Sequence, residues 1–186
     1  DIVALQEVRA GRRRNQAGQL AQSLQLGWLF VPTLRRWYRN YRGNALLSRF
    51  PVSRWRTHML PNITGRRYRV FTVAEVDLGH AALTVLFTHL HTRQGREQQL
   101  EMVLEHFRGL APPAVLLGDL NTGIGDPLLA RYLSTGWVDA LSGVLEPAES
   151  ASRVDWILVR GAVVRGGGST GVGASDHPCY WVEVKV

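Results

Sequence analysis

The chain has 186 residues, of which 45% are apolar, enough for one domain with a substantial core. No apolar stretch approaches the roughly 20 residues that span a membrane, and no signal-peptide pattern is found. The net charge of +7 favours a polyanionic partner, either nucleic acid or anionic lipid headgroups, and does not choose between them.

The first residues have the pattern of a strand already in progress. Ile2–Leu5 is apolar and has no turn or cap before it, so we expect a further segment to precede Asp1. A helical pattern follows over Asn15–Leu26, where Leu20 and Leu24 recur at helical spacing.

The middle of the chain predicts a β-hairpin. Arg66–Asp77 alternates between apolar and polar residues, Gly79-His80 marks a turn, and Ala82–Thr88 is again strand-like. The other predicted strands, with the two hairpin strands at their apolar cores, are Asn44–Ser48, Val70–Asp77, Leu83–Thr88, Val115–Gly118, Val154–Val159 and Tyr180–Val186.

Two more helices are predicted in the second half. Arg96–Phe107 carries apolar residues at helical spacing, and Pro127–Ser134 begins with proline after Asp126, a suitable N-cap. The triple glycine 166–168 predicts a loop or bulge, and Cys179, the single cysteine, is predicted to be a buried structural thiol. Hairpins with occasional helices favour an α/β protein with a largely antiparallel or mixed sheet.

Acids, amides and histidines stand at the ends of these strands. Glu7, His89, Asp119 with Asn121, Asp155, and Asp176 with His177 each end or follow an apolar segment. Each has a structural interpretation taken alone: a solvated strand end, a hydrogen-bonded histidine, an Asx turn or an ordinary turn. Their recurrence at five segments favours a site built on strand-end loops.

The residue types select among chemistries. Carboxylate and amide oxygens suit Mg²⁺, a hard cation that keeps several waters. The sequence has no HExxH spacing, no cysteine cluster and no GxxxxGK[ST] loop, so it gives no support to a zinc protease or to nucleotide hydrolysis by a P-loop.

The order of six motifs carries a resemblance over essentially the whole chain. These motifs are LQE (5–7), GNALLSR (43–49), THL (88–90), GDLN (118–121), RVDWIL (153–158) and SDHP (175–178). Together they resemble the endonuclease/exonuclease/phosphatase superfamily, the deoxyribonuclease I-like proteins. The resemblance implies an α/β/β/α four-layer sandwich of two mixed, mainly antiparallel sheets, formed by residues 1–186 as a single domain.

The resemblance also implies roles for the strand-end residues. Glu7 and Asp176 would bind Mg²⁺, with Mn²⁺ as a substitute. Asp119 would orient or deprotonate the attacking water, and Asn121 and His177 would donate to the phosphate. Asp155 would orient and charge His177.

Four further residues receive roles from the same comparison. His89 occupies a position that is histidine in deoxyribonucleases and sphingomyelinases. Arg9 resembles an arginine that approaches DNA, and Asn44 and Arg96 are secondary candidates for substrate binding at the site. A solvated arginine remains an equal interpretation of Arg9.

Two departures from the family pattern stand out. The family begins with a strand that carries an asparagine, followed by a helix, about 30 residues before LQE, and both are missing from this sequence. We therefore expect a domain without its first strand and helix, with a sheet edge left uncovered. In addition, Arg67 stands where many members have a glutamate.

These observations predict a Mg²⁺-dependent phosphoesterase that cleaves phosphodiester bonds in nucleic acid, DNA or RNA. The alternatives are a phospholipid or small-molecule phosphodiesterase or phosphatase of the same superfamily, and a truncated non-catalytic domain that binds polyanions. We expect a bacterial protein without a membrane span, cytoplasmic if no signal peptide precedes it. The sequence does not predict its oligomeric state.

Overall fold

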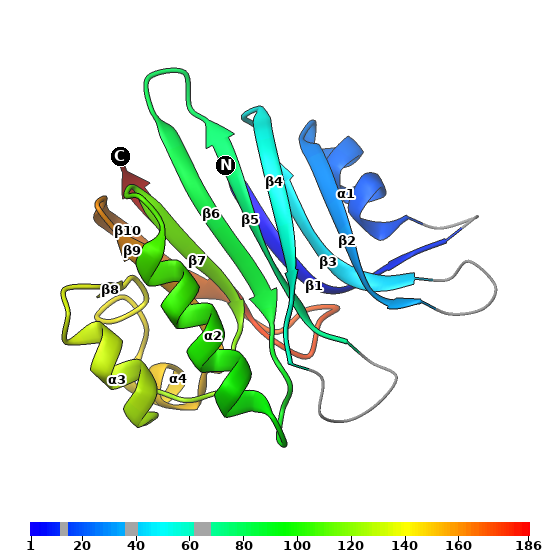
Figure 1. Cartoon of the computed structure of the whole chain (residues 1–186). Coiled ribbons are helices and arrows are strands. Elements are labelled where there is room, and N and C mark those ends of the chain that lie inside the picture. Colours follow the sequence, from blue (N-terminus) through cyan, green and yellow to red (C-terminus); the bar gives the residue numbers. More distant parts are fainter. Residues whose placement is uncertain (12–14, 36–40, 62–67) are drawn as a thin grey trace.

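Two layers of β-sheet stack between helices in the computed structural model, which describes residues 1–11, 15–35, 41–61 and 68–186 (Figure 1). In chain order the elements are β1 (Ile2–Ala10), α1 (Gln16–Leu24), β2 (Gly27–Arg35), β3 (Tyr41–Ser48), β4 (Val52–Met59), β5 (Val70–Asp77), β6 (Ala82–His89), α2 (Arg96–Gly109), β7 (Ala114–Asp119), α3 (Pro127–Leu133), β8 (Val138–Asp139), α4 (Pro147–Ser152), β9 (Asp155–Arg160), β10 (Val163–Thr170) and β11 (Cys179–Lys185).

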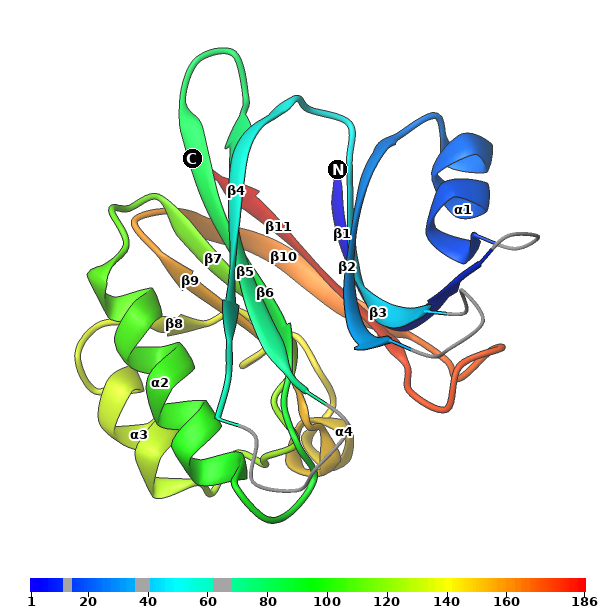
Figure 2. The ribbon, with the colours of Figure 1, turned by 45° about the vertical axis from the view of Figure 1, so that its right-hand side comes forward.

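The larger sheet has six strands in the order β4-β5-β6-β7-β9-β8. A three-stranded sheet, β1-β3-β2, and the β10-β11 hairpin form the facing layer, as the turned view in Figure 2 shows. α1 covers the outside of the three-stranded sheet, and α2 and α3 cover the outside of the larger one. Only the β6–β7 pair is parallel among the strand pairs of the described residues. The predicted four-layer α/β/β/α sandwich with mixed, mainly antiparallel sheets is confirmed.

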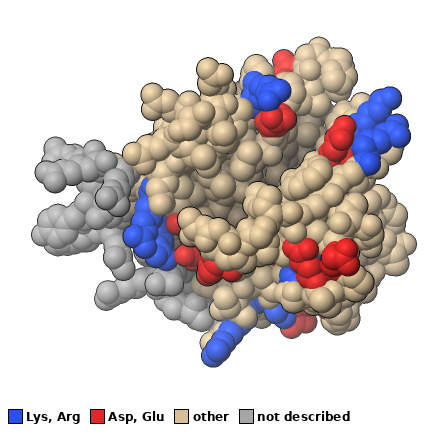
Figure 3. All heavy atoms as spheres, turned by 180° about the vertical axis from the view of Figure 1, so that it is seen from behind, with Lys and Arg blue, Asp and Glu red and all other residues tan. Residues whose placement is uncertain are grey.

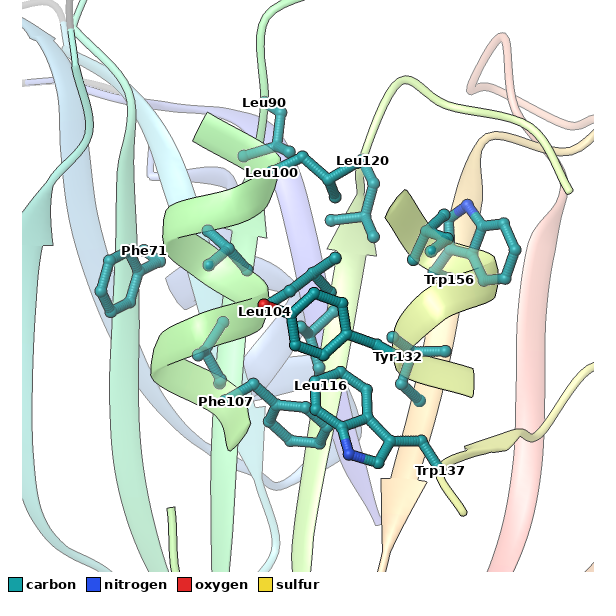
Figure 4. Close-up of a cluster of buried hydrophobic side chains, with 14 of the residues drawn as sticks. Phe71, Leu90, Leu100, Leu104, Phe107, Leu116, Leu120, Tyr132, Trp137 and Trp156 are labelled. Atoms are coloured by element: carbon teal, nitrogen blue, oxygen red, sulfur yellow. The ribbon is translucent and has the colours of Figure 1, made fainter. Parts of the chain in front are cut away.

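The helix-side core of the larger sheet is aromatic and leucine-rich (Figure 4). The periodic residues predicted for α2, among them Leu100, Leu104 and Phe107, are fully buried against β7 and α3. Phe107 meets Trp137 edge-on at 4.9 Å between ring centroids, a favourable aromatic arrangement. This core fixes the strands from which the site residues extend.

Helix α1 differs from its prediction in the face that it buries. Asn15 caps its start, because its side chain accepts a hydrogen bond from the Gly18 N–H at 3.0 Å. The small residues Ala17 and Ala21 are buried against the three-stranded sheet, whereas Leu20 and Leu24 are exposed. Apolar spacing therefore predicted the helix but not the face that it buries, because close packing on a sheet favours small side chains here.

Several elements escaped prediction. β2, β4, β8 and α4 were not expected, and the glycine-rich stretch predicted as a loop or bulge is strand β10. A register shift between Val164 and Gly166 confirms a bulge within that strand. Cys179 is exposed, so the predicted buried thiol is wrong, because it begins edge strand β11, whose alternate residues face outward. Arg67 lies outside the described residues.

Candidate active site

Three polar residues stand in one row across the larger sheet. The strand pairing places His89 of β6 beside Asp119 of β7, and Asp119 beside Asp155 of β9. Partners in register project from the same face of a sheet. Residues two positions away, including Phe87 and Ile157, belong to the core between the two sheets, so the row lies at the end of the inner face.

The end of β7 is shaped by Gly118. Its φ is +152°, and a Cβ there would lie 2.1 Å from the carbonyl oxygen of Thr88 on the adjacent strand. Only glycine allows this close approach of the two backbones, and Leu120 then turns into the core with no exposed surface. Asp119 is thereby held beside β6.

Asp119 and Asn121 form an Asx turn, the structural alternative that the sequence allowed. Oδ1 of Asp119 accepts a hydrogen bond from the Asn121 N–H at 2.9 Å, and Asn121 has a left-handed φ of 51°. The turn uses one oxygen of the carboxylate and leaves Oδ2 for the site. The Asn121 side chain donates from Nδ2 to the carbonyl oxygen of Leu90 at 3.0 Å, which occupies one of its two N–H groups.

His177 reaches the row from the loop before β11. Its Nδ1 lies 2.7 Å from Oδ2 of Asp155. Burial lowers the pKa of His177, but the Asp155 hydrogen bond and the charges of Asp155, Asp119 and Asp176 outweigh burial and leave that pKa raised. His177 therefore holds its proton more readily than a free histidine.

These residues make one group that could hold a metal ion. The ligand atoms of Asp119, Asp155 and His177 all lie within 4.8 Å of one another. Glu7 and Asp176, the predicted metal ligands, belong to no such group among the described residues. Two carboxylates and one imidazole suit a divalent cation, and the oxygen donors favour Mg²⁺ or Mn²⁺.

His89 is the most buried histidine of the site, with 7% of its side chain exposed. Its Nε2 lies 3.3 Å from Oδ2 of Asp119, and its Nδ1 is buried without a partner among the described residues. Burial, followed by the positive charges of Arg69 and His177, lowers the pKa of His89 to about 3. His89 is therefore neutral at physiological pH, with its Nε2 directed toward the Asp119 carboxylate.

Asp119 has the opposite shift. Burial raises the pKa of Asp119 to about 6, the Asn121 N–H lowers it in part, and the negative charge of Asp155 raises it further. A carboxylate with a pKa near 6 is mostly ionised at neutral pH and is a stronger base than a solvated aspartate.

Glu7 sits at an irregularity of β1. The register with β3 shifts between Leu5 and Val8, and Glu7 has a left-handed φ of 57°. Its carboxylate lies 3.1 Å from Nη1 of Arg42, with about half of the Glu7 side chain exposed. The ion pair with Arg42 thus occupies the carboxylate predicted to bind Mg²⁺.

Of the other predicted residues, Arg9 is exposed and is the cross-strand partner of Arg42. Asn44 is buried on β3, and its Nδ2 has no partner in the described part of the chain. Arg96 donates from Nη1 to the carbonyl oxygen of Asn121 at 2.7 Å, so it contacts the site loop itself. Asp176 is exposed beside His177.

Sequence reasoning missed the residues behind the site. Arg153 is almost completely buried and donates from Nη1 to the carbonyl oxygen of Asp155 at 3.0 Å. Trp156 donates from Nε1 to the carbonyl oxygen of Thr122 at 2.8 Å. The arginine in RVDW was a signal, since a charged residue just before a buried strand needs a partner.

Positive charge does not form a uniform field on the face of the molecule seen from behind (Figure 3). On the face seen in Figure 3, Lys and Arg stand in separate groups with acids between them. Within the described residues, no helix is both long enough and apolar enough to cross a bilayer. The charge of the chain thus gives no continuous track for a polyanion on that face.

Solved structures share this fold at low sequence identity. An endonuclease/exonuclease/phosphatase from Beutenbergia cavernae DSM 12333 matches with a TM-score of 0.78 and 22% identity, over 100% of this chain and 62% of its own. The human Nocturnin catalytic domain with bound sulfate matches with a TM-score of 0.67 and 18% identity, over 90% and 72%. Humanized D. rerio TDP2 matches with a TM-score of 0.69 and 19% identity, over 100% and 85%.

Sequence comparison matches the chain to a family and to no individual curated protein. No curated protein matches the chain. The model of the Endonuclease/Exonuclease/phosphatase family matches residues 1–177, which include the whole row of site residues and His177. On this match and this fold, the chain belongs to the Endonuclease/Exonuclease/phosphatase family.

Proposed function

We propose that the protein is a Mg²⁺-dependent phosphoesterase that hydrolyses phosphodiester bonds in nucleic acid. The observation that carries the proposal is the meeting of Asp119, Asp155 and His177 within 4.8 Å at the end of the sheet. Two acids and a charged imidazole at one point supply a base, a proton donor and a cation ligand together. The family of phosphoesterases to which the chain belongs supports this chemistry.

Asp119 is the proposed base. Burial raises its pKa to about 6, so at neutral pH its Oδ2, which the Asx turn leaves unused, accepts the proton of a water molecule as that water attacks phosphorus. The buried ring of neutral His89 lies with its Nε2 3.3 Å from the same oxygen and limits the movement of the carboxylate. The Asx turn fixes the other oxygen, so the carboxylate has little freedom to rotate.

His177 is the proposed donor to the phosphate. Because Nδ1 is committed to Asp155, Nε2 is the nitrogen that faces the substrate. The raised pKa favours the protonated ring, whose charge would stabilise the negative charge that grows on the phosphoryl oxygens. Asn121 contributes the second N–H of its amide.

The donor set fits a divalent cation, since Asp119 and Asp155 supply carboxylate oxygens beside His177. Glu7 and Asp176 remain our proposed ligands, and at Glu7 the cation would replace Arg42 as the partner of the carboxylate. When bound, Mg²⁺ would polarise the phosphate and neutralise part of its charge.

Nucleic acid is the proposed substrate because Arg9 and Arg42 are cross-strand partners on β1 and β3, the strands that carry Glu7 and Asn44. Arg42 is paired with Glu7 in the structure, and a cation bound by Glu7 would leave both arginines to bind a phosphate backbone.

The experiment compares supercoiled DNA, RNA, sphingomyelin, inositol phosphates and bis-p-nitrophenyl phosphate as substrates, with Mg²⁺, with Mn²⁺ and with EDTA. We expect cleavage of nucleic acid that needs the metal and is lost in His177→Ala. Preference for sphingomyelin or inositol phosphates would move the protein to the lipid or small-molecule alternative. No cleavage of any substrate would refute the enzyme and leave a polyanion-binding domain.

A further inference from the structure

A chain of contacts connects the two loops that carry the site residues. At one end, Arg96 donates from Nη1 to the carbonyl oxygen of Asn121 at 2.7 Å. At the other end, Arg153 donates from Nη1 to the carbonyl oxygen of Asp155 at 3.0 Å. Each arginine holds the main chain of a site residue and leaves the side chain of that residue to face the site.

The two arginines are joined through Thr122. The guanidinium of Arg153 lies 4.0 Å over the ring of Trp156, and Nε1 of Trp156 donates to the carbonyl oxygen of Thr122 at 2.8 Å. The Thr122 hydroxyl donates to Oδ2 of Asp126 at 2.7 Å, and the same oxygen lies 3.8 Å from Nη2 of Arg96. The contacts therefore run without a break from Arg96 to Arg153.

Near each arginine, this series of contacts also includes a residue that is bound to a helix or a strand. Oδ1 of Asp126 caps α3 by accepting from the Leu128 N–H at 2.9 Å. Nη2 of Arg153 pairs with Asp139 of β8, and the side chain of Arg153 has no exposed surface. Arg153 resists displacement most, because breaking either of its Nη contacts leaves a buried polar group unpaired.

From these contacts we infer that Arg96 and Arg153 are positioning residues that hold the two arms of the site as one unit. One arm is the Asp119–Asn121 turn, and the other is the Asp155–His177 pair. Arg96 fixes the carbonyl of Asn121, the residue that closes the Asx turn with a left-handed φ of 51°. The kinetic consequence rests on the proposed phosphoesterase function, whereas the physical coupling of the two arms does not.

Arg160 is a matched control on the same strand. It lies at the other end of β9, about 17 Å from Asp155 at the usual rise of a strand. Its Nη1 donates to three carbonyl oxygens at the end of α2, and its guanidinium lies over the rings of Phe107 and Trp137 at 5.7 and 5.8 Å. Arg160→Met thus removes a similar set of contacts away from the site.

The kinetic test measures hydrolysis of bis-p-nitrophenyl phosphate by Arg96→Met, Arg153→Met and Arg160→Met. The melting temperature of each variant is measured as well, so that a loss of activity can be told from a loss of stability. We expect kcat to fall about 10- to 100-fold in the first two, with KM within about twofold, and to stay unchanged in Arg160→Met. The double variant of Arg96 and Arg153 should lose less than the product of the single losses. Multiplied losses, or equal losses in all three variants, would overturn the inference.

Lysine variants keep the test valid if a methionine variant does not fold. A lysine ammonium can replace one Nη contact of each arginine, but it has no planar group to stack on Trp156. We expect Arg96→Lys and Arg153→Lys each to recover part of kcat. Folded lysine variants as inactive as the methionine variants would count against positioning through these contacts.

A second measurement needs no activity. Hydrogen exchange of the Trp156 indole N–H, followed by NMR, should become severalfold faster in Arg96→Met, although Arg96 does not touch Trp156. Arg160→Met should leave it unchanged at the same loss of stability. An unchanged rate in Arg96→Met would refute the coupling, whereas faster exchange in a protein that cleaves no substrate would refute only the phosphoesterase function.

Discussion

Oδ2 of Asp155 and Nδ1 of His177 lie 2.7 Å apart, and they join the first residue of β9 to the loop that leads into β11. This contact gives His177 its raised pKa, since burial alone would lower it. It also orients the ring, because a nitrogen held by a carboxylate leaves Nε2 to face outward. The direction of the His177 ring thus depends on Asp155, and its raised pKa depends on Asp155 first and then on the charges of Asp119 and Asp176.

Replacing Asp155 by asparagine should therefore lower the pKa of His177. The hydrogen-bond and charge contributions of Asp155 disappear, and burial, which favours the neutral ring, remains. Since the proposed donor is the protonated ring, the alkaline limb of the kcat–pH profile should move to lower pH, and kcat at pH 7 should fall at least tenfold. Kinetics from pH 5 to 9, with Asp77→Asn as a control at an exposed carboxylate near the opposite end of the sheet, would check this. An unmoved limb would remove His177 as the donor.

Asp119→Asn should abolish turnover and stabilise the fold. The raised pKa of Asp119, about 6, shows that its charge is costly to bury, and this cost is fully present above pH 6. Asparagine keeps the acceptor for the Asn121 N–H and removes the charge. We expect a gain of up to about 3 kcal/mol at pH 7.5. The kcat should fall by about a thousandfold or more.

Thermal melts of Asp119→Asn and of the wild type at pH 7.5 and at pH 4 separate the effect of charge burial from the effect of packing. The stabilisation should shrink at pH 4, where the wild-type carboxyl group is protonated in the folded state. Equal stabilisation at both pH values would mean that packing, not charge burial, causes the shift.

The fold and the members of the site could be predicted because they depend on local pattern and order. GDLN after an apolar run and SDHP before the last strand mark residues that main-chain geometry must bring to a sheet end. The row itself follows from the parallel β6–β7 pairing, which no single motif encodes. The register of His89 with Asp119 was therefore visible only in the structure.

Other features depend on long-range contacts and could not be predicted. Leu20 and Leu24 have helical spacing but face solvent, because the three-stranded sheet accepts the alanine side of α1. Glu7 pairs with Arg42, which is remote in sequence. The role of Arg153 follows only from the positions of Asp139, Trp156 and Asp155 around it.

His89→Gln should reduce the loss of stability in acid. The folded-state pKa of His89 is about 3, against an ordinary value of 6.5, so the unfolded chain binds a proton that the folded protein does not bind between those values. The free energy of unfolding therefore falls as pH drops from 6.5 toward 3, by several kcal/mol at most. Urea unfolding at pH 7 and pH 4 should show a smaller difference for His89→Gln than for the wild type. Equal differences would mean that His89 is not the acid-labile group.

Substitutions at the two partners of the Glu7–Arg42 ion pair should change Mg²⁺ affinity in opposite directions. Glu7→Gln removes a proposed ligand and should raise the Mg²⁺ concentration for half-maximal activity about tenfold or more. Arg42→Gln removes the cation that lies 3.1 Å from the Glu7 carboxylate and should lower that concentration. Calorimetric titration of Mg²⁺ without substrate would separate metal affinity from any effect of Arg42 on substrate binding. If both variants bind Mg²⁺ like the wild type, Glu7 is not a metal ligand.

Gly118→Ala should damage both the fold and the site. The new methyl group would lie 2.1 Å from the Thr88 carbonyl oxygen, so β6 and β7 must separate where His89 and Asp119 are neighbours. We expect a loss of about 3 kcal/mol in the free energy of unfolding, with lower kcat in the protein that remains folded. Gly123→Ala, in the loop that follows β7 and with no atom within 4 Å of the added Cβ, is the control and should stay near the wild-type value. Urea unfolding of both variants checks the difference. A Gly118→Ala protein as stable and active as its control would show that close contact between the two strands is not what holds Asp119 beside His89.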